Sequence, residues 1–193
     1  MWLNRLVVVG VLVLTAAPGQ GPLTDQQVAR VIDRADKVKD TSVCVGRSAA
    51  PDFRICLQGP EQRIVVATAI AKQEHHRLRP ADVPAEVRAH TWSIIVRPGQ
   101  PALVAGQPVR SALAENLTVQ VPGRPELSVR AMDVAPLAVT WGNAVGATLK
   151  GQGLTASVDA STLPPGDLDI VIVEDSGTAR RYGLAQSLRA QIH

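Results

Sequence analysis

The chain has 193 residues, of which 46% are hydrophobic, 19% charged and 3% aromatic. This length predicts one or two domains, and the apolar fraction suffices for a buried core, which excludes an intrinsically disordered chain. The formal net charge is only +3 and no block of Lys and Arg occurs. We therefore expect no nucleic-acid partner, because contacts with a phosphate backbone require clustered cations.

The first 19 residues have the pattern of a secretory signal peptide. Arg5 precedes an apolar run at residues 6–14, and Ala17 and Gly19 supply the small side chains that cleavage needs. The run is shorter than the roughly 20 apolar residues that span a bilayer. We expect cleavage before Gln20, export to the periplasm or the extracellular space, and no stable membrane anchor after cleavage. An uncleaved N-terminal anchor is the alternative.

The two cysteines, Cys44 and Cys56, predict a disulfide. An even number of cysteines in an exported protein favours a disulfide. Each cysteine lies in a short apolar segment, and the turn-rich residues 47–52 separate the two, which predicts two antiparallel strands joined covalently. A reactive pair or two metal ligands are the alternatives, but the spacing is not that of Cys-x-x-Cys and no further ligands lie nearby.

Residues 20–98 predict a small α+β domain. Thr24 and Gln27 form a capping box ahead of an apolar stripe at helical spacing, so residues 24–40 predict an amphipathic helix whose stripe faces the core. A second helix is expected to begin at Pro60 and to end before Pro80. Residues 81–91 predict a turn with a short helical piece, and residues 92–97 predict a strand.

Residues 99–193 predict an all-β domain, and the Pro- and Gly-rich residues 98–101 mark its boundary. Short apolar or alternating runs separated by turns are typical of a β-sandwich or barrel. The sequence does not decide whether the two halves share one core. The runs are residues 102–105, 109–114, 117–121, 127–132, 137–141, 147–149, 154–158, 168–174, 179–184 and 188–192.

The end of the chain carries a resemblance to a known class of domain. Residues 163–167 read Leu-Pro-Pro-Gly-Asp and precede the alternating strand 168–173, a turn at 174–177 and a second strand at 178–184. This order resembles the last hairpin of bacterial immunoglobulin-like sandwich domains, although strand 168–173 lacks the usual aromatic residue. The resemblance covers about 25 residues and implies an immunoglobulin-like β-sandwich; such folds host many functions.

Histidines are the first candidates for catalysis or metal binding. His75 and His76 are adjacent, and His90 follows 14 residues later. Neighbouring residues on a helix point about 100° apart, so His75 and His76 do not easily bind one ion there. No zinc-protease motif is present. We interpret the three histidines as surface residues and predict no metal ion and no cofactor.

Two acidic patterns are also interpreted as structural. Asp175-Ser176-Gly177 matches the core of aspartic proteases, but that chemistry needs two aspartates, and Glu174 stands where the family has an apolar residue. We therefore predict an ordinary hairpin turn. Asp167 and Asp169 share one strand face with no calcium-binding loop around them, and we interpret them as solvated carboxylates.

The sequence favours a non-enzymatic function. No complete catalytic motif is present, and a β-sandwich offers strand edges to which a partner strand can be added. We therefore expect an exported binding or assembly module that contacts protein, and a homo-oligomer is possible. One alternative is an exported hydrolase or metal-dependent enzyme. The other is a carbohydrate-binding module that uses Trp92, Trp141 and Tyr182.

Overall fold

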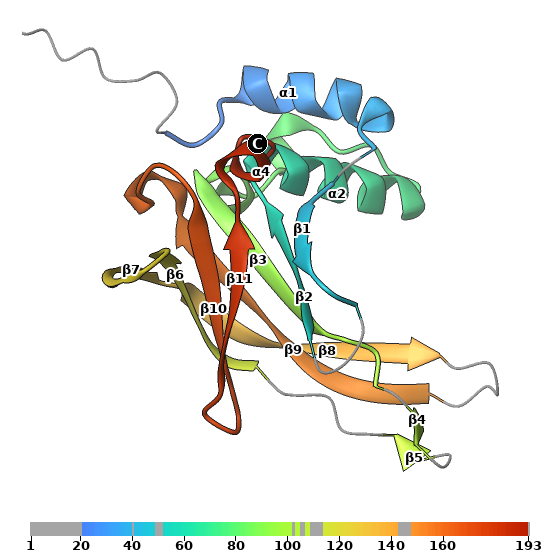
Figure 1. Cartoon of the computed structure of the whole chain (residues 1–193). Helices are drawn as coiled ribbons and strands as arrows, with labels where there is room; N and C mark the ends of the chain where they lie inside the picture. The colour runs from blue at the N-terminus through green and yellow to red at the C-terminus, as the bar shows by residue number, and fades with distance from the viewer. Residues whose placement is uncertain are drawn as a thin grey trace, which may run out of the picture.

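The structure is a computed structural model that describes residues 21–39, 41–48, 52–101, 103–104, 107–108, 114–142 and 148–192. The predicted signal peptide and most of the apolar run at 109–114 lie outside these residues. The described chain is mostly β, with two larger antiparallel sheets and a few helices (Figure 1). No described helix is both long enough and apolar enough to cross a membrane.

The elements follow one another in the order of their labels in Figure 1. The helices are α1 (Asp25–Arg34), α2 (Pro60–Gln73), α3 (Ala85–Arg88) and α4 (Gln186–Arg189), with short 3₁₀ turns at Ala35–Lys37, Pro80–Asp82 and Ala160–Thr162. The strands are β1 (Val43–Gly46), β2 (Phe53–Gln58), β3 (Thr91–Pro98), β4 (Leu103–Val104), β5 (Gln107–Pro108), β6 (Ala114–Val121), β7 (Arg124–Arg130), β8 (Met132–Gly142), β9 (Thr148–Asp159), β10 (Leu168–Glu174) and β11 (Ala179–Leu184).

The two predicted long helices form and pack against each other. The Thr24 hydroxyl accepts a hydrogen bond from the Gln27 backbone N–H, and the Gln27 side chain accepts one from the Thr24 N–H at 2.8 Å, which confirms the capping box. Helix α2 begins at Pro60, as expected. The apolar stripe of α1 faces α2, and the two helices enclose a small core of their own. Its buried members are Val28, Val31, Ala35, Ile64, Val65 and Val83.

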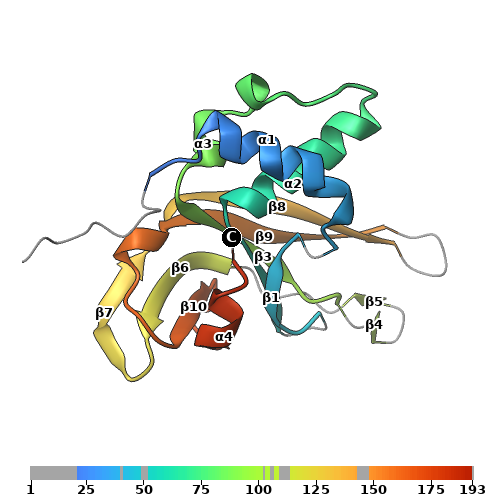
Figure 2. The same ribbon diagram turned by 90° about the horizontal axis from the view of Figure 1, so that it is seen from above.

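Strands from both halves of the chain form one five-stranded sheet in the order β1-β2-β3-β9-β8. The boundary that the sequence favours lies at the end of β3, and β3 pairs antiparallel with β9 of the second half. A second sheet has the order β11-β10-β6-β7. Figure 2 shows this second sheet on one side of the five-stranded sheet and α1, α2 and α3 on the other.

The two sheets enclose the larger core, which residues before and after position 98 share. Phe53, Ile94 and Leu154 of the five-stranded sheet belong to the same buried cluster as Leu117 and Ile170 of the four-stranded sheet. The question that the sequence left open is thereby answered, because both halves contribute to one core. Burial of alternate residues in β2, β3 and β10 matches the period-2 pattern of strands with one inward face.

The predicted disulfide is present. Cys44 on β1 and Cys56 on β2 are direct cross-strand partners and are covalently joined. The chain contains no other cysteine. A structural disulfide is typical of proteins outside the reducing cytoplasm.

The C-terminal segment confirms one prediction and corrects another. Strands β10 and β11 form the expected hairpin, and the Gly177 N–H donates to the Glu174 carbonyl at 2.9 Å in the turn between them. Residues 188–192 were expected to form a strand, but residues 186–189 form the helical turn α4. The Asp167 carboxylate accepts a hydrogen bond of 2.8 Å from the Gln186 N–H and so caps this turn, which no local pattern shows.

Candidate functional site

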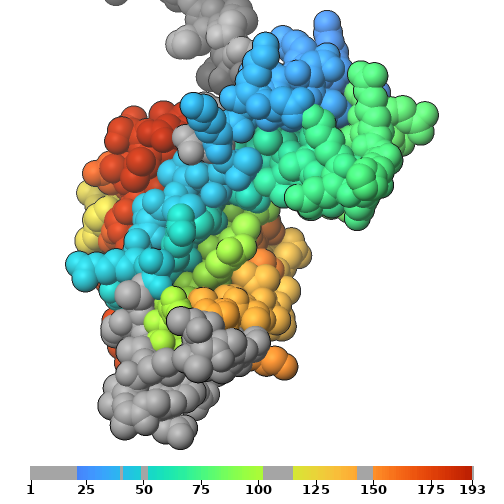
Figure 3. All heavy atoms as spheres, turned by 90° about the vertical axis from the view of Figure 1, so that its right-hand side faces the viewer, coloured from blue at the N-terminus to red at the C-terminus, as the bar shows by residue number. Residues whose placement is uncertain are grey.

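The five-stranded sheet has a solvent-facing outer side that is hollowed beneath the helices. Figure 3 shows this side, with β2, β3 and the β8–β9 pair below the overhanging helical layer. Two cavities of about 610 and 520 Å³ lie on it, and Gln58 and Ile95 line both. The two cavities therefore adjoin, and we call them together the outer-face groove.

One end of the outer-face groove is cationic. Arg54 on β2 and Arg97 on β3 are direct cross-strand partners, both are exposed, and both line the larger cavity. Neither side chain forms an ion pair or hydrogen bond with any residue that the structure describes. The remaining described lining residues of this cavity are uncharged: Thr41, Ser42, Cys44, Ser48, Cys56, Gln58, Val66, Ile95, Pro98, Val139, Thr140 and Trp141.

An indole ring forms the opposite wall of this cationic end. Trp141, near the end of β8, is half-buried and lies over Gly151 of β9, where a Cβ atom would stand 2.4 Å from the ring. Gly153, two residues along β9, has a different constraint, because a Cβ there would lie 2.0 Å from the Val96 carbonyl oxygen. The approach to a backbone oxygen requires glycine at position 153, whereas a side chain at position 151 would displace the Trp141 ring.

At the other end of the groove lies a partly buried arginine that has no carboxylate partner among the described residues. Arg63 of α2 donates to the hydroxyl oxygens of Thr91 and Ser93 at 3.0 and 3.2 Å and to the Ala89 carbonyl at 2.6 Å. Its Nε is buried without a hydrogen-bond partner, and burial lowers the pKa of Arg63. The guanidinium ties α2 to the start of β3, and the lining of this end of the groove also includes the carboxylates of Glu86 and Asp133.

Strand β8 forms the far edge of the same sheet. Among the residues that the structure describes, it pairs only with β9, and it ends the strand order. Its second half, residues 137–142, contains no charged residue and alternates between half-buried and exposed positions. Val139 and Trp141 from this segment also line the groove, so the free edge and the groove adjoin.

The register of β8 shows which backbone groups face outward. Pro136 pairs with Leu154. Because proline has no N–H, the two residues form a non-hydrogen-bonded pair, in which the backbone groups of Pro136 point away from β9. The register is continuous from residue 135 to residue 142. The backbone N–H and C=O groups of Ala138 and Thr140 therefore also point away from β9, toward the free side of the sheet.

The other sheet edges are less accessible. Strands β1 and β11 contact each other, and the Phe53 N–H donates to the Tyr182 hydroxyl oxygen at 3.0 Å beside them. Strand β7 carries Arg124, Glu126 and Arg130 together with Pro125, the residue types that protect an edge from further pairing. The first half of β8 has a register shift and Pro136. Residues 137–142 are thus the most open edge of the two larger sheets.

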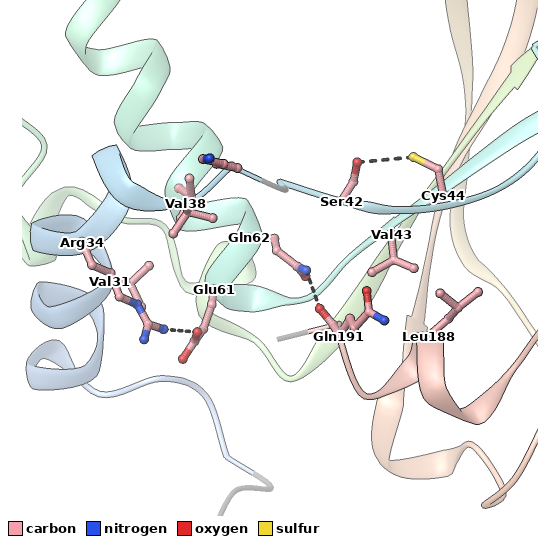
Figure 4. A pocket seen from close by; sticks show the side chains of 12 residues that line it. Val31, Arg34, Val38, Ser42, Val43, Cys44, Glu61, Gln62, Leu188 and Gln191 are labelled. Carbon is pink, nitrogen blue, oxygen red and sulfur yellow. Dashed lines mark hydrogen bonds and ion pairs between the residues drawn. The ribbon is translucent and has the colours of Figure 1, made fainter.

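A third cavity lies between the two cores (Figure 4). Its volume is about 620 Å³, and α1, α2, β1 and the C-terminal segment line it. Apart from Lys39, its charged side chains are paired, because Arg34 pairs with Glu61, and the Gln62 side chain donates to the Gln191 carbonyl at 2.8 Å. We therefore do not place a polar ligand in this cavity.

The structure does not bring the candidate histidines together into a metal site. His75 and His76 are exposed just after α2, and His75 has a φ of 60°. His76 lies 3.7 Å from Glu74, and His90 precedes β3. Within the described residues, no group of three or more His, Cys, Asp or Glu side chains could hold a metal ion.

The candidate aromatic residues occupy three different environments. Trp92 is 7% exposed in the larger core, and the Arg189 guanidinium lies 5.5 Å from its ring centroid. Trp141 lines the outer-face groove on β8, whereas Tyr182 is on β11 of the other sheet. The three rings therefore do not form the row on one face that a carbohydrate-binding platform needs.

Glu174, which precedes the Asp-Ser-Gly motif, has a structural partner. Glu174 accepts a hydrogen bond from Arg180, which raises the pKa of that guanidinium, and Arg180 also lies 3.7 Å from Asp52. Asp175-Ser176-Gly177 occupies the β10–β11 turn, with Gly177 at a φ of 80°. The turn interpretation of this motif agrees with that geometry.

The sequence analysis missed the two features that define the site. Arg54 and Arg97 are 43 positions apart and neither belongs to a motif, so only the β2–β3 register shows that they are neighbours. The uncharged run at residues 137–142 is visible in the sequence, but its position at a sheet edge is not. Comparisons with protein-family models, curated proteins and solved structures show no match to this chain.

Proposed function

We propose that this protein is an exported, non-enzymatic binding module that takes up an extended segment of a partner protein along residues 137–142 of β8. The observation that carries the proposal is the free, uncharged edge of that strand. Strand addition supplies main-chain hydrogen bonds for affinity and places alternate side chains of the added segment over each face of the sheet.

Exposed apolar side chains at the turn from β7 to β8 also support a protein partner. Leu127 on β7 is 44% exposed, and Met132 and Val134 at the start of β8 are 47% and 42% exposed. These residues lie where the chain passes from one sheet to the other. A partner that covers this corner would bury apolar surface in addition to pairing with the edge, which favours association.

The proposal also includes export of the protein and an immunoglobulin-like relationship of its fold. The apolar run at residues 6–14 and the Cys44–Cys56 disulfide support export by a cleaved signal peptide. The β10–β11 hairpin with its preceding Leu-Pro-Pro-Gly turn supports an immunoglobulin-like relationship. The two expected domains, residues 20–98 and 99–193, contribute to one larger core.

Photo-crosslinking tests the proposal. A photoreactive residue replaces Thr140 in the full chain exported by its own host, and the matched control carries the same residue at Glu126 on β7. The expected result is one discrete adduct at position 140 and none at 126. In a second sample, Ala138→Pro removes an outward N–H without touching the β8–β9 hydrogen bonds, so the adduct should be lost. Equal adducts at 140 with and without this change would refute strand addition.

A further inference from the structure

Arg54 and Arg97 occupy an arrangement that costs folding free energy. They face each other directly across β2 and β3, at the range where like charges on adjacent strands repel. No described carboxylate lies within ion-pairing distance of either guanidinium, although the chain contains 17 acidic residues. The fold therefore maintains two adjacent cations, unpaired among the described residues, in an open groove.

The surroundings of the two arginines indicate the kind of anion that fits. Ile95, Val139 and the Trp141 ring provide apolar surface beside the guanidinium groups, and Ser48 and Thr140 add hydroxyl groups. A small inorganic ion would contact the arginines alone and leave the apolar surface uncovered. A chain that carries carboxylates next to apolar side chains would cover both.

We propose that the cationic end of the outer-face groove binds the carboxylates of an acidic, partly apolar peptide segment. Each planar guanidinium can pair with a carboxylate through two parallel hydrogen bonds. The aliphatic part of the segment packs on Ile95, Val139 and Trp141. This site goes beyond strand pairing at β8, because its charged contacts come from Arg54 on β2 and Arg97 on β3 and it requires no added strand.

Calorimetry on the disulfide-bonded full chain, isolated after export, tests the site. The probe is the capped pentapeptide Glu-Leu-Glu-Leu-Glu, and its counterpart Gln-Leu-Gln-Leu-Gln reports the contribution of charge. We expect saturable binding of the acidic peptide that weakens as salt is added, and little binding of the neutral one. The indole emission of the chain, to which Trp141 in the groove contributes, should change in parallel.

Two variants and one control locate the binding. Arg54→Gln and Arg97→Gln should each weaken binding about tenfold, the loss expected for one charge-assisted interaction. Arg130→Gln, at an exposed position on β7, should leave binding unchanged. Because each groove variant relieves the repulsion, its melting temperature should equal or exceed that of the wild type, which separates lost binding from lost folding.

Other outcomes overturn the inference. If the groove variants bind the acidic peptide as tightly as the wild type, the site lies elsewhere. If inorganic phosphate binds as tightly as the peptide, the arginines form a small-oxyanion site and no peptide is recognised. Ala138→Pro should not change the binding of the acidic peptide. If the peptide fails to bind the wild type, strand addition at β8 is therefore not refuted, because the crosslinking experiment tests it separately.

Discussion

The Tyr182 hydroxyl oxygen accepts a hydrogen bond of 3.0 Å from the backbone N–H of Phe53. Tyr182 is on β11, an edge of the four-stranded sheet, and Phe53 begins β2 in the other sheet. This bond therefore ties the two sheets together on the side where β1 and β11 meet. It connects residues 129 positions apart, across the boundary between the two halves of the chain.

Tyr182→Phe should destabilise the fold. The substitution keeps the ring but leaves the Phe53 N–H without its acceptor, and an unsatisfied buried donor costs about 1–3 kcal/mol. Urea unfolding should show a lower midpoint with an unchanged slope. Arg181→Gln, at the neighbouring exposed position, serves as the control and should leave the midpoint unchanged.

Titration to alkaline pH should report the burial of Tyr182 directly. Burial raises the pKa of Tyr182 above its ordinary value of 10.0, and this is the single tyrosine of the chain. Above pH 10 the unfolded chain loses the phenol proton first, so the free energy of unfolding should fall as the pH rises toward the pKa of the folded protein. Tyrosinate absorbance should therefore titrate at higher pH in buffer than in urea, and coincident curves would contradict the assignment.

Removal of the disulfide should lower stability without altering the sheet order. Cys44 and Cys56 are 12 residues apart in sequence, and closure of a loop of this size contributes about 2–4 kcal/mol. The double substitution of both cysteines by alanine should lower the urea midpoint, and a reducing agent should produce the same shift in the wild type. A reducing agent that leaves the wild-type midpoint unchanged would show that the bond contributes nothing to stability.

Gly153→Ala should destabilise the contact between β3 and β9. The new Cβ would lie 2.0 Å from the Val96 carbonyl oxygen, a backbone atom that cannot move alone. Overpacking of this kind costs about 1–3 kcal/mol. Gly142→Ala is the matched control, because a Cβ atom there would meet nothing within 4 Å beyond its chain neighbours. Thermal unfolding should distinguish the two variants, and equal melting temperatures would argue against the close approach.

Local signals allowed much of the secondary structure to be predicted from the sequence. The capping box at Thr24, the proline that begins α2 and the glycine-containing turn before β11 each act within four residues. The pairing of Cys44 with Cys56 follows from cysteine number and spacing. These elements could be predicted without knowing which residues far apart in the sequence contact each other.

Long-range pairing could not be predicted in the same way. Val96 pairs with Leu154, 58 positions away, and no local pattern selects that partner. The open edge at β8 depends on this sheet order. The apolar run at residues 188–192 fits both a strand and a helical turn, and the Asp167 carboxylate, 19 residues before Gln186, favours the turn. Sequence alone therefore predicted elements but neither the groove nor the free edge.

Native mass spectrometry of the protein recovered from its own host after export tests the proposed function most directly. For the wild type, the account predicts a chain without its first 19 residues, two hydrogens lighter than the reduced form and bound to a partner polypeptide. In the Ala138→Pro variant the partner mass should be absent while the disulfide remains. A bare chain in both samples, or a partner that the variant retains, would contradict binding through the edge of β8.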